Sequence, residues 1–494
     1  MRIGIRFGFA LSLIFVTTSL IAQSWQNVRA PLPHGVSPTA PSLLSDGSVL
    51  VHNACGRDWY KLTPDSSGSY INGTWSTISP LPAGYAPLYF GSAVLPDGRF
   101  IVEGGEYNAS AGQACKAVWT TKGAIYDPVA NTWSAIAPPS GWTSIGDAWG
   151  GVLANGTYLQ TNCCITTQAL LDAKTLTWTP TGAGKFDVPD EEPMVMIPGG
   201  NLLAVDAYVF QYDRTGTNSE IYNASTGTWS TAGSTMVQLW DSFPDANHAS
   251  YEVGPALLRP DGTVFATGAN GGGAAHTSIY NTKAGMWTPG PDFPDNLGIA
   301  DGPACTLPNG NGFMMASPGV FQTGAQFLQW DGTQLTYDTA SNPFSGDSSY
   351  YGNMVMLPTG QVLFTDFSAV AVYTPAGGPK SGWLPRVTSS PAAMTRAASY
   401  TISGTQFNGV SQGCYYGDDF ASATNFPLVR FSYPATGHVF YARTHGFSYM
   451  GVQHPGIVST EVDVPAAMET GAASMQVIAN GIASPAVIVT IQRQ

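Results

Sequence analysis

The sequence has 494 residues, with 19 Lys and Arg against 32 Asp and Glu, which gives a formal net charge of −13. This acidic balance argues against a nucleic-acid partner, because phosphate backbones are bound through basic patches. The length suits one large repeat domain followed by a small one.

Residues 1–22 predict a secretory signal peptide. Arg2 and Arg6 precede an apolar run from Phe7 to Ile21, and Ala22 is a small residue at the expected cleavage point. The run is too short for a comfortable membrane span, and no later segment is long and apolar enough to be one. We therefore expect an exported protein (secreted, periplasmic or at the cell surface) with no transmembrane segment.

A hairpin is the repeating unit of residues 23–380. In VLPDGRFIVEGG, from Val94 to Gly105, two apolar runs meet at a Pro-Asp-Gly turn, where glycine accepts a positive φ. An apolar third strand follows each hairpin, and a Trp opens most of the fourth strands. Repeated hairpins of this period predict a β-propeller, here with seven blades. The turn glycines are Gly47, Gly98, Gly156, Gly200, Gly262, Gly310 and Gly360.

The two ends of the repeat region complement one another. The strand at Trp25 has no hairpin before it, and the strand at Val372 has no Trp strand after it. If the Trp25 strand completes the last blade, both irregularities disappear and the ring closes without a large free sheet edge.

The pattern changes after a Pro- and Gly-rich linker, Pro375 to Arg386. Residues 386–494 read as short alternating strands, which is typical of one immunoglobulin-like β-sandwich. The predicted fold class is therefore all-β, a seven-bladed propeller followed by a C-terminal sandwich.

Four cysteines follow a second strand in three successive blades, so we expect them on one face. One disulfide bridge is expected among them, most readily from Cys115, whose long loop can reach. Cys305 and Cys414 are expected to be free. The bridge candidates are Cys55, Cys115, Cys163 and Cys164.

Carboxylates recur where an inner strand begins, nine or ten residues before the turn glycine. Propeller geometry would bring them to one central mouth, on the face that also carries two insertions, 106–121 and 234–252. Acids at strand starts also cap loop N–H groups, which is the alternative explanation. The ligand-binding candidates are Asp147, Glu192, Glu252, Asp301 and Tyr351, and the catalytic candidates are Glu191, Glu192, Glu252, Asp301 and Tyr350.

The hairpin-plus-Trp repeat resembles kelch repeats, and TISGTQF (from Thr401) is similar to an IPT/TIG-type immunoglobulin segment. An exported kelch propeller with such a C-terminal domain resembles galactose oxidase and glyoxal oxidase, the copper-radical oxidases. The resemblance implies one copper held by two Tyr and two His, with one Tyr cross-linked to a Cys.

Three of those five positions differ in this chain. His445 and Tyr350 match a histidine and a tyrosine ligand, whereas Tyr351 stands at the second histidine, Tyr89 at the cysteine and Asp147 at the cross-linked tyrosine. The copper-radical site is therefore not expected to be retained, and His445 and Tyr350 would be the ligands if copper were bound.

Two kinds of function remain. The first is binding of a glycan, a small molecule or a cation-bridged ligand at the acidic mouth, with calcium on Glu252 and Asp301 as the possible cofactor. The second is an enzyme of the same fold, either a divergent copper oxidase of alcohols or aldehydes or a carboxylate-dependent glycan hydrolase or lyase.

Overall fold

The computed structural model describes residues 22–109, 115–207, 216–241, 252–269, 274–319, 321–412 and 421–494. The expected signal peptide, apart from Ala22, lies outside these residues, as do Cys414 and most of the second insertion. The described chain is all-β, with three short 3₁₀ turns and no α-helix: η2 (Pro294–Asn296), η3 (Ser349–Tyr351) and η4 (Ser381–Trp383).

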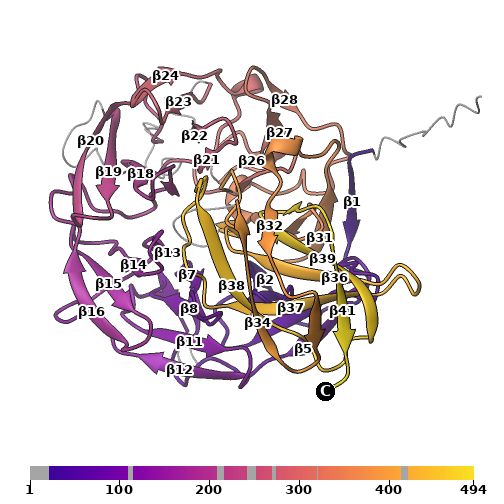
Figure 1. The fold of residues 1–494 in the computed structure, drawn as a ribbon. Helices are drawn as coiled ribbons and strands as arrows, with labels where there is room; N and C mark the ends of the chain where they lie inside the picture. The colour runs from indigo at the N-terminus through magenta and orange to yellow at the C-terminus, as the bar shows by residue number, and fades with distance from the viewer. Residues whose placement is uncertain are drawn as a thin grey trace, which may run out of the picture.

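Small antiparallel sheets arranged around a centre form a β-propeller (Figure 1). Six of them have four strands. In chain order they are β2 (Pro38–Leu43), β3 (Val49–Asn53), β4 (Trp59–Thr63), β5 (Thr74–Thr77); β7 (Gly91–Val94), β8 (Phe100–Glu103), β11 (Gly123–Asp127), β12 (Thr132–Ile136); β13 (Gly150–Val152), β14 (Tyr158–Gln160), β15 (Gln168–Asp172), β16 (Thr177–Thr181); β17 (Met194–Met196), β18 (Leu202–Val205), β19 (Asn218–Asn223), β20 (Thr228–Ser234); β21 (Ala256–Leu258), β22 (Thr263–Thr267), β23 (Thr277–Asn281), β24 (Met286–Pro289); and β25 (Ala304–Thr306), β26 (Gly312–Ala316), β27 (Gln326–Trp330), β28 (Leu335–Tyr337).

The last propeller sheet joins distant parts of the chain. It runs in the order β1 (Ser24–Asn27), β31 (Val370–Thr374), β30 (Val362–Thr365), β29 (Asn353–Met356) and β35 (Ala421–Ser422). Trp25 pairs with Tyr373 across β1 and β31, which is the pairing predicted for the two ends of the repeat region. The Trp25 ring lies 4.8 Å from Phe327 and 5.2 Å from Phe344 between ring centroids. The N-terminal strand is therefore fixed by a ladder and by an aromatic cluster.

The turn glycines behave as the sequence predicts. All seven have φ between 79° and 88°. Gly47 shows a second reason for glycine, because a Cβ there would come within 2.5 Å of the Tyr441 ring.

The C-terminal region has its own sheets. The strand order is β32-β34-β38-β37-β36-β39-β41-β33, with β40 on β39. The strands are β32 (Arg386–Ser389), β33 (Ala393–Thr395), β34 (Ser399–Thr405), β36 (Leu428–Ser432), β37 (Val439–His445), β38 (Ile457–Asp463), β39 (Gly471–Ala479), β40 (Ile482–Ala483) and β41 (Val487–Gln492). Short β35 instead pairs parallel with β29, so this region also contributes an innermost strand to the propeller, which the sequence did not indicate.

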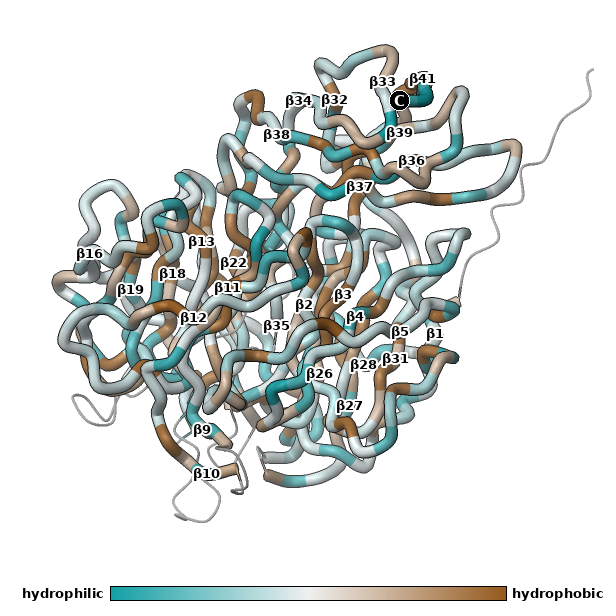
Figure 2. Tube along the Cα trace, turned by 90° about the horizontal axis from the view of Figure 1, so that it is seen from below, coloured by the Kyte–Doolittle hydropathy of each residue, from teal (hydrophilic) through white to brown (hydrophobic). Residues whose placement is uncertain are grey.

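The C-terminal region covers the face of the propeller that carries the hairpin turns. Thr444 N–H donates to the Ser45 carbonyl (3.1 Å), and the Arg443 guanidinium donates to the Asp97 carbonyl (2.7 Å). The opposite face, which we call the open face, carries the small sheet of β6 (Pro87–Leu88), β9 (Tyr107–Asn108) and β10 (Lys116–Ala117). Figure 2 shows β37 and β39 on one side and β9 and β10 on the other.

Two disulfides lie in loops of the open face. Cys55 bonds to Cys115 and Cys163 bonds to its neighbour Cys164, so the four candidate cysteines form two bridges where the sequence predicted one, and Cys115 takes part as expected. Cys305 is buried and free, as predicted. Disulfides are compatible with export. In the part of the chain that the structure describes, no helix has the length and apolar character of a membrane span.

Candidate functional site

Three carboxylates meet at the open face. Glu191, Glu252 and Asp301 stand before β17, β21 and β25, the first strands of three successive sheets, and one oxygen from each lies within 4.8 Å of the others. The repeat places each acid at the same level of its own sheet, and the ring of sheets turns them toward one another. The structure therefore brings together three residues that the sequence singled out.

The backbone beneath this group is strained. Glu191 and Asp301 have φ of 55° and 48°, in the left-handed region that non-glycine residues rarely occupy. Such conformations cost on the order of 1–3 kcal/mol each and are concentrated at functional sites. Tyr89, on the same face, has φ of 54°. The strain motivates a functional interpretation of these positions.

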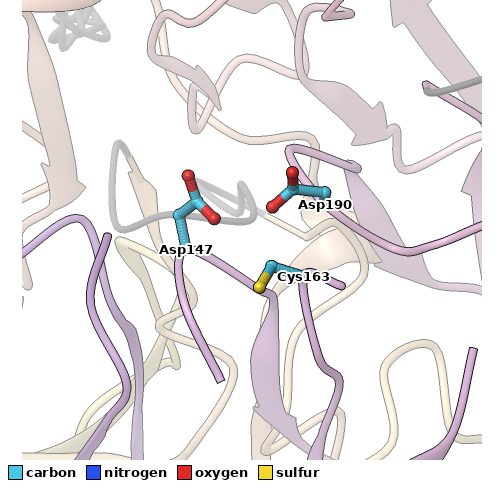
Figure 3. Close-up of side chains that lie close together, drawn as sticks. All are labelled: Asp147, Cys163 and Asp190. Atoms are coloured by element: carbon cyan, nitrogen blue, oxygen red, sulfur yellow. The ribbon is translucent and has the colours of Figure 1, made fainter. Parts of the chain in front are cut away.

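A second group lies beside the first. An isolated β-bridge between Ala148 and Asp190 holds Asp190 next to Asp147. One oxygen of each acid and the sulfur of Cys163 lie within 4.8 Å of one another (Figure 3). Asp147 thus faces the neighbouring sheet and the vicinal disulfide.

Glu106 is a site residue that the sequence reasoning missed. Burial, followed by the nearby charges of Asp147 and Asp301, raises the pKa of Glu106 to about 8. Burial and the Glu106 carboxylate likewise raise the pKa of Tyr107. The available signal was the insertion 106–121, which begins at this residue. At neutral pH the site therefore contains a carboxyl group that is largely protonated.

Tyr350 and Tyr351 close another side of the site from η3. Their rings stack with centroids 4.3 Å apart, and Phe321 lies edge-on to Tyr350 at 5.6 Å. Burial, the hydrogen bond to Tyr351 and the charge of Asp301 raise the pKa of Tyr350. Tyr350 is therefore a neutral phenol over the ordinary pH range.

Glu192 does not lie with the acids and tyrosines of the open face, so its predicted position at the propeller mouth is wrong. It is fully buried, and its Oε1 accepts a hydrogen bond from Lys185 Nζ (3.0 Å). Glu191 and Glu192 are adjacent, so their side chains leave the chain in different directions. The same ammonium also bonds three further carboxylates, those of Asp187, Asp206 and Glu220.

The two candidate copper ligands lie on different faces. His445 Nε2 is 3.0 Å from Asp463 Oδ1, and its neighbour Thr444 bonds a hairpin turn of the covered face. Tyr350 precedes β29 on the open face. Among the described residues, none of the three groups with metal-ligand spacing contains a histidine.

Comparison with known proteins supports the fold alone. No protein-family model matches the sequence, and no curated protein matches it. A fungal alcohol oxidase of the AA5 family, solved in complex with copper, is 15% identical, covers 95% of this chain and 100% of its own, and has a TM-score of 0.51. Virginiamycin B lyase from Staphylococcus aureus, solved with quinupristin, is 10% identical over 72% of this chain and 99% of its own, with a TM-score of 0.46. A putative gluconolactonase is 11% identical over 73% and 95%, with a TM-score of 0.37. The first similarity supports a β-propeller fold, and the other two, with TM-scores under 0.5, carry no argument.

Proposed function

We propose that this chain is an exported kelch-type propeller protein, with seven blades and an immunoglobulin-like C-terminal domain, that binds a carbohydrate through a divalent cation at its open face. The observation that carries the proposal is the meeting of Glu191, Glu252 and Asp301 from three successive sheets. Three carboxylate oxygens at this spacing are the donors that calcium prefers.

The protonation of Glu106 supports a cation at this place. Burial, and after it the nearby charges of Asp147 and Asp301, raises the pKa of Glu106 to about 8, so negative charge already lies close to this carboxyl group. A divalent cation would offset that charge and displace the proton. Cation binding is therefore expected to release a proton near neutral pH.

Exposed aromatic rings beside the acids suit a sugar. Trp119 is 49% exposed and Tyr351 36% exposed. Such rings can stack on the apolar face of a pyranose, while carboxylates accept hydrogen bonds from its hydroxyl groups. A calcium ion bound by three carboxylates would have coordination positions left for sugar hydroxyl oxygens.

Copper-radical chemistry does not fit the residues present. The two matching ligands, His445 and Tyr350, lie on opposite faces, and an aspartate stands where the cross-linked tyrosine is needed. We therefore propose that the protein does not act as a copper-radical oxidase.

A second candidate function is hydrolysis or elimination of a glycan, favoured by Glu106 alone. A carboxyl group with a pKa near 8 is suited to donate a proton to a leaving group at neutral pH. One of Glu191, Glu252 or Asp301 would then act as base or nucleophile. Release of reducing ends or unsaturated sugars, lost in Glu106→Gln, is the expected sign of this activity.

A glycan array tests the binding proposal. The wild type is probed in calcium and in excess chelator, together with Glu252→Gln/Asp301→Asn and a control, Asp58→Asn, which removes an exposed acid outside the three groups. We expect calcium-dependent binding by the wild type and the control and none by the double variant. Equal binding by all three, or no binding to any glycan, would contradict the proposal.

A further inference from the structure

The vicinal disulfide is held firmly at the edge of the open face. Cys163 is 2% exposed, whereas Cys164 is exposed. Cys163 N–H donates to the Ile145 carbonyl (2.9 Å), and Cys164 N–H donates to Asn162 Oδ1 (3.0 Å). An external reductant can therefore reach one sulfur while the other stays buried in a fixed position.

The buried sulfur faces two carboxylates. Cys163 Sγ and one oxygen each of Asp147 and Asp190 lie within 4.8 Å of one another, and Figure 3 shows the two carboxyl groups turned toward each other. Asp147 is 3% exposed, and its Oδ1 has no hydrogen-bond partner among the described residues. A buried carboxylate oxygen without a donor is costly unless a proton or a cation satisfies it.

The donor set is that of a borderline-soft metal once the disulfide is open. A disulfide sulfur is a poor ligand, but a cysteine thiolate binds Zn²⁺ at about 2.3 Å and a carboxylate oxygen at about 2.1 Å. Ligands of a tetrahedral zinc ion then lie roughly 3.5 Å apart. Small side-chain rotations would bring three atoms from 4.8 Å or less to this spacing.

We propose that Asp147, Cys163 and Asp190 form a zinc site that is opened by reduction of the Cys163–Cys164 disulfide. A dithiol transfers two electrons and two protons to the disulfide, so the S–S bond breaks, two cysteine thiols form and the dithiol becomes a cyclic disulfide. Zn²⁺ then binds Cys163 Sγ as the thiolate and releases its proton. Asp147 and Asp190 supply two oxygen ligands, and Cys164 or water completes the coordination.

The two carboxylates also make the metal and the redox state interdependent. Without a cation they oppose a negative charge on Cys163, which favours the closed disulfide. A bound cation favours the reduced form instead, because a ligand that binds only the dithiol shifts the equilibrium between disulfide and dithiol toward the dithiol. Zn²⁺ at 100 times its Kd would shift the equilibrium about 100-fold, which is about 59 mV in the reduction potential.

Zinc affinity measured in both redox states tests this site. The protein is titrated with Zn²⁺ against a chromophoric chelator, oxidised or after anaerobic reduction with a phosphine. We expect one Zn²⁺ per reduced chain, bound at least 100-fold more tightly than by the oxidised chain. Co²⁺ in place of Zn²⁺ should give a sulfur-to-cobalt charge-transfer band only after reduction. Equal affinity in the two states, or no such band, would overturn the proposal.

Variants assign the ligands. Asp147→Asn is expected to lower zinc affinity at least tenfold in the reduced protein, and Cys163→Ser to abolish the cobalt band. Two control variants should leave the zinc affinity and the cobalt band unchanged: Cys55→Ser/Cys115→Ser, which removes the other disulfide, and Asp58→Asn. Unchanged zinc affinity in a folded Asp147→Asn protein would contradict Asp147 as a ligand. If that variant does not fold, the cobalt band of Cys163→Ser tests the site, and a band that persists there contradicts it.

Discussion

Replacing Glu106 with glutamine should change how stability depends on pH. The pKa of Glu106 is raised from 4.5 to about 8 in the folded protein, mainly by burial. A folded-state pKa above the unfolded value means that stability is fully present below about pH 4.5 and is lost as the pH rises toward 8. A shift of about 3.5 units corresponds to roughly 4.8 kcal/mol. Because the side chain is partly exposed, solvent screening reduces the expected loss to about 2 kcal/mol.

Denaturant unfolding at pH 5 and pH 9 measures this difference. Glutamine is neutral in both states, so Glu106→Gln should be about 2 kcal/mol more stable relative to wild type at pH 9 than at pH 5. Asp58→Asn, at an exposed acid, should show no such change. If the stability of Glu106→Gln falls with pH as steeply as that of the wild type, the ionised Glu106 does not destabilise the folded protein and its pKa is not raised.

Three further changes test the packing. Trp25→Ala removes the indole that joins β1 to the Phe327 and Phe344 cluster, and should lower the free energy of unfolding by about 2–4 kcal/mol in a denaturant titration. An unchanged midpoint would mean that the N-terminal strand does not close the propeller. Cys55→Ser/Cys115→Ser removes a disulfide between residues 60 apart in sequence, and the gain in chain entropy of the unfolded state should lower the free energy of unfolding by up to about 4 kcal/mol. An unfolding midpoint that does not move when the wild type is reduced would contradict this expectation. Lys185→Met leaves four buried carboxylates without their ammonium and should cost about 3–5 kcal/mol, whereas Lys174→Met, on the surface, should be neutral in the same thermal scan.

The propeller was predictable because its unit is local. Each hairpin contains its own turn glycine, and all seven glycines adopt nearly the same positive φ because each occupies the same position of the same turn. The pairing of the Trp25 strand with the Val372 strand followed from counting, since each end lacked what the other supplied. The insertion of β35 beside β29 was not predictable, because two residues of irregular sequence in the C-terminal region carry no repeat signal.

The site was predictable only where it depends on the repeat. Glu191, Glu252 and Asp301 occupy equivalent positions, so their meeting follows from the symmetry of the sheets. Glu192 is the next residue along the chain, and its buried side chain accepts a hydrogen bond from Lys185 instead. Glu106 and the Cys163–Cys164 pair lie in loops, whose paths depend on contacts between neighbouring sheets. The sequence repeat therefore predicts neither which of two adjacent residues faces the site nor the path of a loop.

Calorimetric titration with Ca²⁺ at pH 7, repeated in two buffers of different ionisation enthalpy, measures whether Glu191, Glu252 and Asp301 hold a cation. The wild type should bind one Ca²⁺ and release up to about one proton, because Glu106, with its pKa near 8, is mostly protonated before binding. Glu252→Gln/Asp301→Asn should bind none while unfolding at nearly the wild-type temperature. Calcium binding that survives in this double variant, or a wild type that binds no calcium, would contradict the account.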